Sequence, residues 1–129
     1  MWPNSPLNLR KLKMPDERIM ILEDEAIIAW DIEAELQSRG MTVVGVVGHV
    51  AEAQALVEAG DITIAILDIN VGSENSYGIA HLCREKGIAV IFLTGETGDE
   101  RPEGLKDCPI TSKPVNYNQL MDALRQIGA

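Results

Sequence analysis

Short, continuously apolar runs alternate with longer amphipathic segments along this chain, and this alternation constrains the fold more than any other feature. Four runs are rich in β-branched residues and leave no residue for a solvated face, as expected of strands covered on both sides. They are residues 19–22, 42–47, 62–67 and 88–93, and a shorter fifth run lies around 108–112. Strands separated by helices in this rhythm predict an α/β fold, an open, doubly wound, five-stranded parallel sheet with right-handed crossovers.

Three predicted helices end in the same signal, a glycine at the position of a left-handed cap. They are 25–39 before Gly40, 50–59 before Gly60 and 79–86 before Gly87. A further helix is predicted over 117–127, with Asn116 as its N-cap. The stretch 95–109 differs, because it holds two prolines and three glycines with almost no apolar period. It predicts a short or irregular helix after the fourth strand, with little apolar area to hold it in place.

Composition limits the functions open to the chain. Its 129 residues are enough for one domain, and an apolar fraction of 46% with a net charge of −9 is typical of a folded protein that binds neither nucleic acid nor an anionic membrane. Cys83 and Cys108, without a secretory leader or a long apolar run, predict reduced thiols in a cytoplasmic protein. Residues 1–16 contain three prolines and no sustained period, and we expect a flexible extension there, with the folded domain over 17–129.

Polar side chains stand at the ends of four predicted strands. The first run passes directly into Glu23 and Asp24, the third ends in Asp68, the fourth in Thr94 and the fifth in Lys113. Each of these residues alone has an ordinary interpretation as a helix cap, a turn residue or a solvated lysine. Because open parallel sheets place their sites beyond the carboxyl ends of the strands, the four together predict one polar pocket.

This joint pattern resembles the receiver domain of two-component response regulators over residues 18–127. The resemblance implies that Asp68 is the phosphoacceptor and that Thr94 and Lys113 contact the phosphoryl group. It also implies a magnesium ion, and a cis peptide bond between Lys113 and Pro114. The implied metal ligands are Glu23, Asp24, Asp68 and the backbone carbonyl of Asn70.

An aspartate carboxylate can accept a phosphoryl group, but three carboxylates alone would repel phosphate. A magnesium ion, which prefers oxygen ligands, reverses that repulsion. The acidic end of the first strand is thereby explained as a metal site whose like charges repel when no metal is bound.

The chain ends two residues after the predicted last helix, which favours a stand-alone receiver that signals by protein–protein interaction and is not itself an enzyme, apart from slow self-dephosphorylation. The stretch "IFLTGETGDE" is similar to the F-x-T-G subset of alphaproteobacterial single-domain response regulators. Two departures stand out. Glu96 replaces the aromatic residue usual after Thr-Gly in that subset, and Ile110 replaces the aromatic residue that swings inward in most receivers.

The first predicted helix carries a second apolar strip. Ile28, Ile32 and Leu36 form its core stripe, whereas Ile27, Trp30 and Ala34 point largely the other way. Since this strip begins beside the acidic pocket, we expect it to dock a sensor histidine kinase or a phosphotransfer protein. Incidental surface apolarity is the alternative.

Three other functions are alternatives to a phosphorylated receiver. A phosphatase with an aspartate nucleophile would place a second acid two residues after it, where Asn70 stands, and a flavodoxin-like nucleotide binder would have a glycine-rich loop after the first strand. A third alternative is a pseudo-receiver or adaptor that regulates a kinase without being phosphorylated. The sequence names neither the kinase nor the downstream partner.

Overall fold

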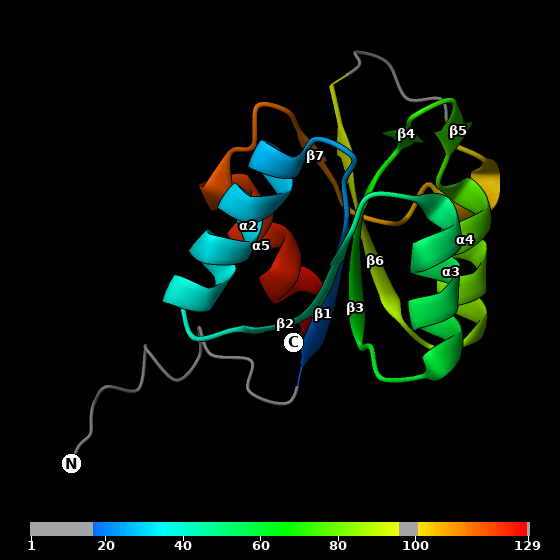
Figure 1. Cartoon of the computed structure of the whole chain (residues 1–129), viewed down its shortest axis with the longest axis horizontal. Coiled ribbons are helices and arrows are strands. Elements are labelled where there is room, and N and C mark those ends of the chain that lie inside the picture. The colour runs from blue at the N-terminus through cyan, green and yellow to red at the C-terminus, as the bar shows by residue number, and fades with distance from the viewer. Residues whose placement is uncertain (1–16, 96–100, 129) are drawn as a thin grey trace.

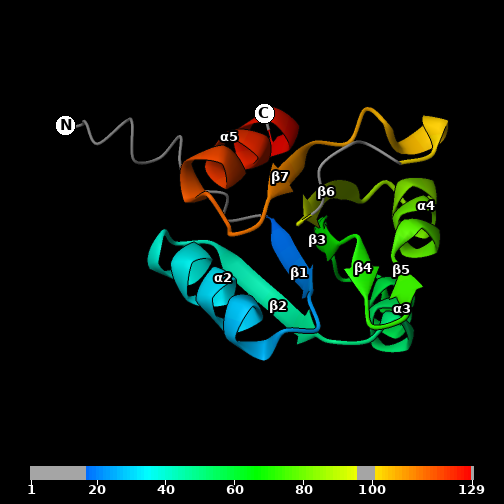
Figure 2. The same cartoon turned by 90° about the horizontal axis from the view of Figure 1, so that it is seen from above.

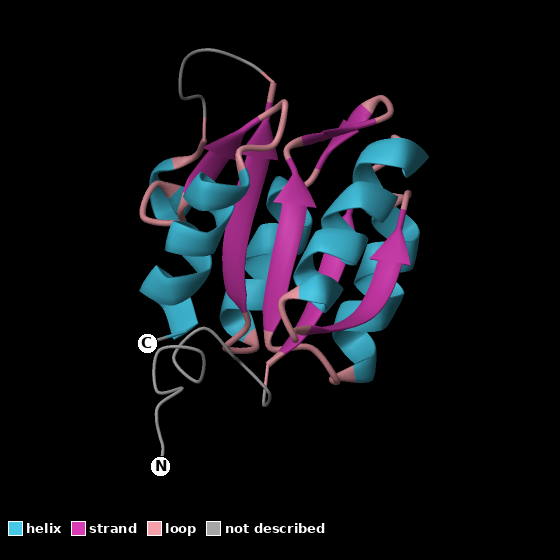
Figure 3. Ribbon diagram, turned by 90° about the vertical axis from the view of Figure 1, so that its left-hand side faces the viewer, coloured by secondary structure: helices cyan, strands magenta, loops and turns pink. Residues whose placement is uncertain are grey.

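A computed structural model of the chain describes residues 17–95 and 101–128. In this part of the chain, five strands form one parallel sheet in the order β2-β1-β3-β6-β7, and Figure 3 shows them running in the same direction. The strands are β1 (Arg18–Leu22), β2 (Thr42–Val47), β3 (Ile64–Asp68), β6 (Ala89–Thr94) and β7 (Ile110–Ser112). The predicted α/β fold is confirmed, and β2 matches its predicted bounds.

Within the described ranges, four α-helices cover the two faces of the sheet. They are α2 (Ala26–Ser38), α3 (Val50–Ala59), α4 (Tyr77–Glu85) and α5 (Tyr117–Gly128). Helices α2 and α5 lie on one face, and α3 and α4 lie on the other (Figures 1 and 2). The helix that sequence placed at 79–86 begins two residues earlier, at Tyr77. Gly60 takes the left-handed conformation at the end of α3, with φ of 86°.

Alternation along the strands divides the core into two layers, because successive side chains of a strand point to opposite faces. Met20 and Leu22 of β1 pack with Phe92 of β6 under α3 and α4. Ile19 and Ile21 pack against α2 and α5 on the other face. The central strands therefore read as continuous apolar runs, since both of their faces are buried.

A small antiparallel hairpin, which the sequence analysis did not predict, follows β3. Its strands are β4 (Asn70–Val71) and β5 (Glu74–Asn75), and Gly72 in the turn between them has φ of 61°. Figure 1 shows the hairpin at the edge of the sheet where the strands end. With two residues to a strand, the hairpin is too short for period-two alternation to reveal it.

The segment before β7 contains no full helix in its described part, as predicted. Residues Glu103–Leu105 form a single 3₁₀ turn. The prediction that little apolar area holds the segment in place is wrong for its second half, because Leu105 and Cys108 are buried in the core. Arg84 of α4 also binds both carboxylate oxygens of Asp107, at 3.1 and 3.0 Å. Residues 96–100, which the prediction also covered, lie outside the described residues.

Candidate functional site

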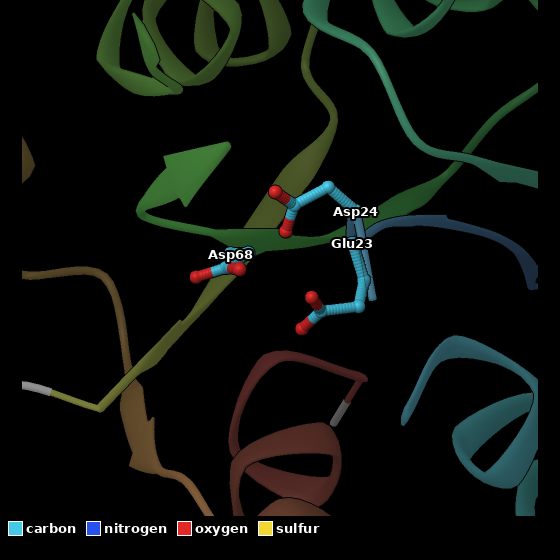
Figure 4. A group of neighbouring side chains, drawn as sticks. All are labelled: Glu23, Asp24 and Asp68. Carbon is cyan, nitrogen blue, oxygen red and sulfur yellow. The ribbon is translucent and has the colours of Figure 1, made fainter. Parts of the chain in front are cut away.

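Two adjacent central strands bring three carboxylates together. Leu22, the last residue of β1, pairs with Leu67 of β3, so the residues that come next in each chain segment, Glu23 and Asp68, stand at the same level. Glu23 and Asp24 reach from the end of β1 toward Asp68 at the end of β3 (Figure 4). One carboxylate oxygen of each residue lies within 4.8 Å of the others. Glu23 and Asp68 are buried, and Asp24 is exposed.

Lys113 supplies the positive charge of this pocket. Its Nζ lies 2.9 Å from Glu23 Oε1, 3.1 Å from Asp68 Oδ2 and 3.4 Å from Glu25 Oε1. The lysine follows directly after β7, and its backbone N–H donates to the carbonyl oxygen of Thr94 at 2.8 Å. The peptide bond between Lys113 and Pro114 is cis, as the resemblance implied.

Burial and neighbouring charges shift the pKa values of Asp68, Glu23 and Lys113. Burial raises the pKa of Asp68 and of Glu23, and this outweighs the opposing effect of Lys113 on each carboxylate. Burial alone would lower the pKa of Lys113, but its close contacts with Glu23 and Asp68 and their negative charges raise it instead. The lysine therefore stays charged at neutral pH, and the two buried acids share one cation.

Backbone amides hold the carboxylates in place. The N–H of Glu25 donates to Glu23 Oε2 at 2.9 Å, and the N–H of Gly72 donates to Asp24 Oδ2 at 2.9 Å. Glu23 Oε1, by contrast, is buried and accepts no hydrogen bond of regular geometry from the residues that the structure describes, although it forms the ion pair with Lys113. An acceptor oxygen in this state, beside two other carboxylates, fits a pocket that holds a divalent cation.

The structure brings together Glu23, Asp24, Asp68 and Lys113 as predicted. Asn70 adjoins them, because its N–H points to Asp68 Oδ1 at 3.4 Å, and the role of its carbonyl stays a prediction. The role of the Thr94 hydroxyl also stays a prediction. Sequence reasoning missed two contributors to the pocket, Glu25 and Gly72. The third acid of the run "EDE" was a signal for Glu25, whereas Gly72 reaches Asp24 only through the unpredicted hairpin.

A groove opens beside the pocket on the α2 side of the sheet. Its volume is about 540 Å³, and its lining includes Ile27, Trp30, Ala34 and Val115. The side chains of Ile27 and Trp30 are 80% and 62% exposed, which agrees with the predicted outward strip. Tyr117 of α5 donates its hydroxyl proton to Asp31 of α2 at 2.5 Å, so that the two helices are joined next to the groove.

Known proteins with a similar sequence or a similar structure identify the family of the chain. No protein-family model matches the chain. Transcriptional regulatory protein PdtaR of Mycobacterium tuberculosis is 28% identical over 111 residues, which cover 83% of this chain and 54% of PdtaR. The chain thus spans about half the length of this curated relative. No helix in the described residues is long and apolar enough to cross a membrane.

Solved structures match over almost the whole domain. A response regulator receiver protein from Sinorhizobium medicae WSM419 has a TM-score of 0.78 and 26% identity, and the match covers 87% of this chain and 94% of that protein. SdrG from Sphingomonas melonis Fr1 has a TM-score of 0.75 and 37% identity, over 86% of this chain and 95% of SdrG. SdrG has also been solved in a BeF3-activated conformation. With this fold and this degree of identity, the chain belongs to the receiver-domain family of response regulators.

Proposed function

We propose that the chain accepts a phosphoryl group from a sensor histidine kinase or phosphotransfer protein onto Asp68 and signals by protein–protein interaction. One observation carries this proposal: Lys113 Nζ lies 3.1 Å from Asp68 Oδ2, inside a pocket of three converging carboxylates. The family membership and the BeF3-activated form of SdrG support the same reading. Such an acceptor is not an enzyme in the usual sense, since Asp68 itself is modified, and slow self-dephosphorylation restores it.

The proposed step is a single phosphoryl transfer. A carboxylate oxygen of Asp68 attacks the phosphorus atom of a phosphohistidine and forms a new P–O bond. The P–N bond breaks, and its electron pair stays on the imidazole nitrogen, which then takes a proton. Lys113 neutralises charge on the equatorial oxygens, and the Thr94 hydroxyl donates a hydrogen bond to one of them.

The acidic pocket fits a magnesium ion. Glu23, Asp24 and Asp68 offer oxygen ligands within 4.8 Å of one another, and the backbone carbonyl of Asn70 is the remaining proposed ligand. Glu23 Oε1, which accepts no regular hydrogen bond from the described residues, is placed to act through a water molecule. When bound, magnesium supplies the positive charge that lets phosphate approach three acids.

The same geometry suggests how phosphorylation is read out. Lys113 now contacts Glu23, Glu25 and Asp68 together, so a phosphoryl group on Asp68 competes with the other two carboxylates for the lysine. Lys113 is joined to Thr94 through its backbone N–H, and Thr94 begins the segment that leads to β7. With Ile110 in place of an aromatic residue, we propose that ordering of residues 96–107 on phosphorylation is the signal.

The kinase docks, in this proposal, on Ile27, Trp30 and Ala34 of α2. These side chains line the groove beside Pro114, the residue that follows Lys113, so a bound helix would lie next to the acidic pocket. A large exposed aromatic side chain is the kind of residue that dominates an interface. We also propose a cytoplasmic, stand-alone receiver of the F-x-T-G subset.

The test of this function is phosphotransfer from histidine kinases of the source organism. Each kinase is labelled on its histidine with radioactive phosphate and is then mixed with the wild-type chain or with Asp68→Asn. Transfer of label to the wild type alone is the expected result. If both proteins bind a kinase and change its activity equally, and neither takes up label, the chain is instead an adaptor that needs no phosphorylation.

A further inference from the structure

A second groove is lined by residues of α3, α4 and the hairpin. These two helices cover the face of the sheet opposite α2 (Figures 1 and 2). The volume of the groove is about 490 Å³, and the hairpin strand β5 contributes to its lining. Its lining includes Val50, Gln54, Glu74, Gly78, Leu82 and Glu85. None of these residues belongs to the acidic pocket or to the α2 groove. This surface is therefore separate from the one proposed for the kinase.

The groove combines an apolar floor with acidic ends. Val50 and Leu82 are half-buried and belong to the edge of the core under these helices. Glu74 lies on the hairpin and Glu85 is the last residue of α4, so the two exposed acids stand toward opposite ends of the groove. In the described part of the chain, no salt bridge joins either acid to a cation, whereas the neighbouring Arg84 is paired with Asp107.

The wall formed by the hairpin is held by hydrogen bonds on both sides. The N–H of Ser76 donates to the carbonyl oxygen of Ile69 at 2.9 Å, and the N–H of Tyr77 donates to Asn75 Oδ1 at 3.0 Å. The Gly72 amide joins the turn to Asp24. The groove thus exists before a ligand arrives, and binding loses little entropy in ordering its wall.

From this geometry we propose that the α3–α4 groove binds a cationic amphipathic helix of a partner protein. Apolar side chains of that helix would pack on Val50 and Leu82, and lysines or arginines near its two ends would meet Glu74 and Glu85. Helix α4 has nine residues and spans about 13 Å, so the two cations would stand two to three turns apart. Gly78 leaves room for close approach, since a Cβ added there meets no atom within 4 Å.

This proposal goes beyond phosphorylation and gives the domain two independent surfaces. The α2 groove and the α3–α4 groove lie on opposite faces of the sheet, so a kinase helix on one does not obstruct a helix on the other. A receiver built in this way can hold its phosphodonor and a second protein at the same time.

The test uses the full chain and a designed helical peptide of leucine, alanine and lysine, about fourteen residues long, with leucines along one face and a lysine near each end of that face. Amide chemical shifts and the dissociation constant are measured by NMR. We expect shifts in α3, α4 and the hairpin. Gly78→Leu, whose Cβ has room and whose side chain is meant to occupy the groove, and Glu85→Lys should each weaken binding about tenfold, a loss of about 1.4 kcal/mol.

Two variants separate this site from general attraction to an acidic protein. Asp122→Lys makes the same change of charge as Glu85→Lys on α5, across the sheet, and Trp30→Ala removes the anchor of the other groove. Neither should change the affinity by more than about twofold. Equal weakening by Asp122→Lys and Glu85→Lys, shifts centred on α2, or unchanged binding by a folded Gly78→Leu would overturn the proposal.

Discussion

Lys113 Nζ lies 2.9 Å from Glu23 Oε1, and this contact joins the ends of β7 and β1, which are not neighbours in the sheet. The same ammonium group also contacts Asp68, so one cation serves two buried carboxylates. The metal-free pocket therefore depends on the lysine for its charge balance, and the lysine is the group that a phosphoryl group on Asp68 would attract.

Replacing this lysine should destabilise the metal-free domain. Lys113→Met leaves Glu23 and Asp68 buried without a cation. Removing one partner of a buried ion pair lowers the free energy of unfolding by about 3 kcal/mol. Urea unfolding in the presence of a chelator measures the change. Lys106→Met, which alters an exposed lysine, is the matched control and should leave the midpoint nearly unchanged. Equal midpoints for Lys113→Met and the wild type would contradict the charge balance inferred here.

The raised pKa of Asp68 predicts a specific dependence on pH. Because the folded state holds the proton of this carboxyl more tightly than the unfolded state, Asp68 lowers stability above its raised pKa, and the loss disappears as pH falls toward the ordinary value of 3.8. Metal-free Asp68→Asn should accordingly be more stable than the wild type at pH 7, with the difference shrinking as the solution is acidified. A difference that grows on acidification would show that the pKa of Asp68 is lowered.

The hydrogen bond between Gly72 and Asp24 predicts that the hairpin responds to the acidic pocket. Asp24→Ala removes the acceptor, and the Gly72 amide should then exchange its hydrogen about fivefold faster, as expected for the loss of about 1 kcal/mol. Asp24→Asn keeps an acceptor oxygen and should have a smaller effect. Glu25→Ala changes an adjacent acid whose carboxylate contacts Lys113 instead of the hairpin, and it serves as the control. Unchanged exchange in Asp24→Ala would mean that this hydrogen bond does not hold the turn.

The Trp30→Ala variant distinguishes docking of the kinase from the phosphorylation of Asp68. Trp30→Ala should slow phosphotransfer from the kinase about tenfold or more, because a central aromatic anchor is lost, while a small phosphodonor should react with Asp68 at the wild-type rate. Stopped reactions followed by gel or mass analysis give both rates. Gln54→Ala, an exposed residue of α3 on the other face of the sheet, is the control and should change neither rate. Equal transfer from the kinase to Trp30→Ala and to the wild type would exclude this strip as the docking site.

The fold was predictable because the central strands are buried on both faces. Runs such as 62–67 cannot be amphipathic when helices cover both sides of the sheet, and their apolar continuity is therefore visible in the sequence. Because open parallel sheets place their sites beyond the carboxyl ends of the strands, Asp24 and Asp68 were expected at the same edge. The structure brings them together. The outward strip on α2 followed from helical periodicity in the same way, and Trp30 is indeed exposed.

What could not be predicted depends on contacts between residues far apart in the sequence. The hairpin has two residues in each strand, which is below the length at which alternation can be recognised. Leu105 lies in a stretch with no helical period, and its burial follows from packing against α4. The contact of Glu25 with Lys113 spans 88 positions, and no local pattern in the sequence marks the two residues as partners.

Phosphorylation of Asp68 is the central claim, and intact-protein mass spectrometry after treatment with magnesium and a small phosphodonor tests it most directly. The wild type should gain the mass of one phosphoryl group, and most of that gain should be absent when a chelator is present. The Asp68→Asn variant should show no gain. A phosphorylated species of undiminished height in Asp68→Asn, or none in the wild type with magnesium present, would contradict the account.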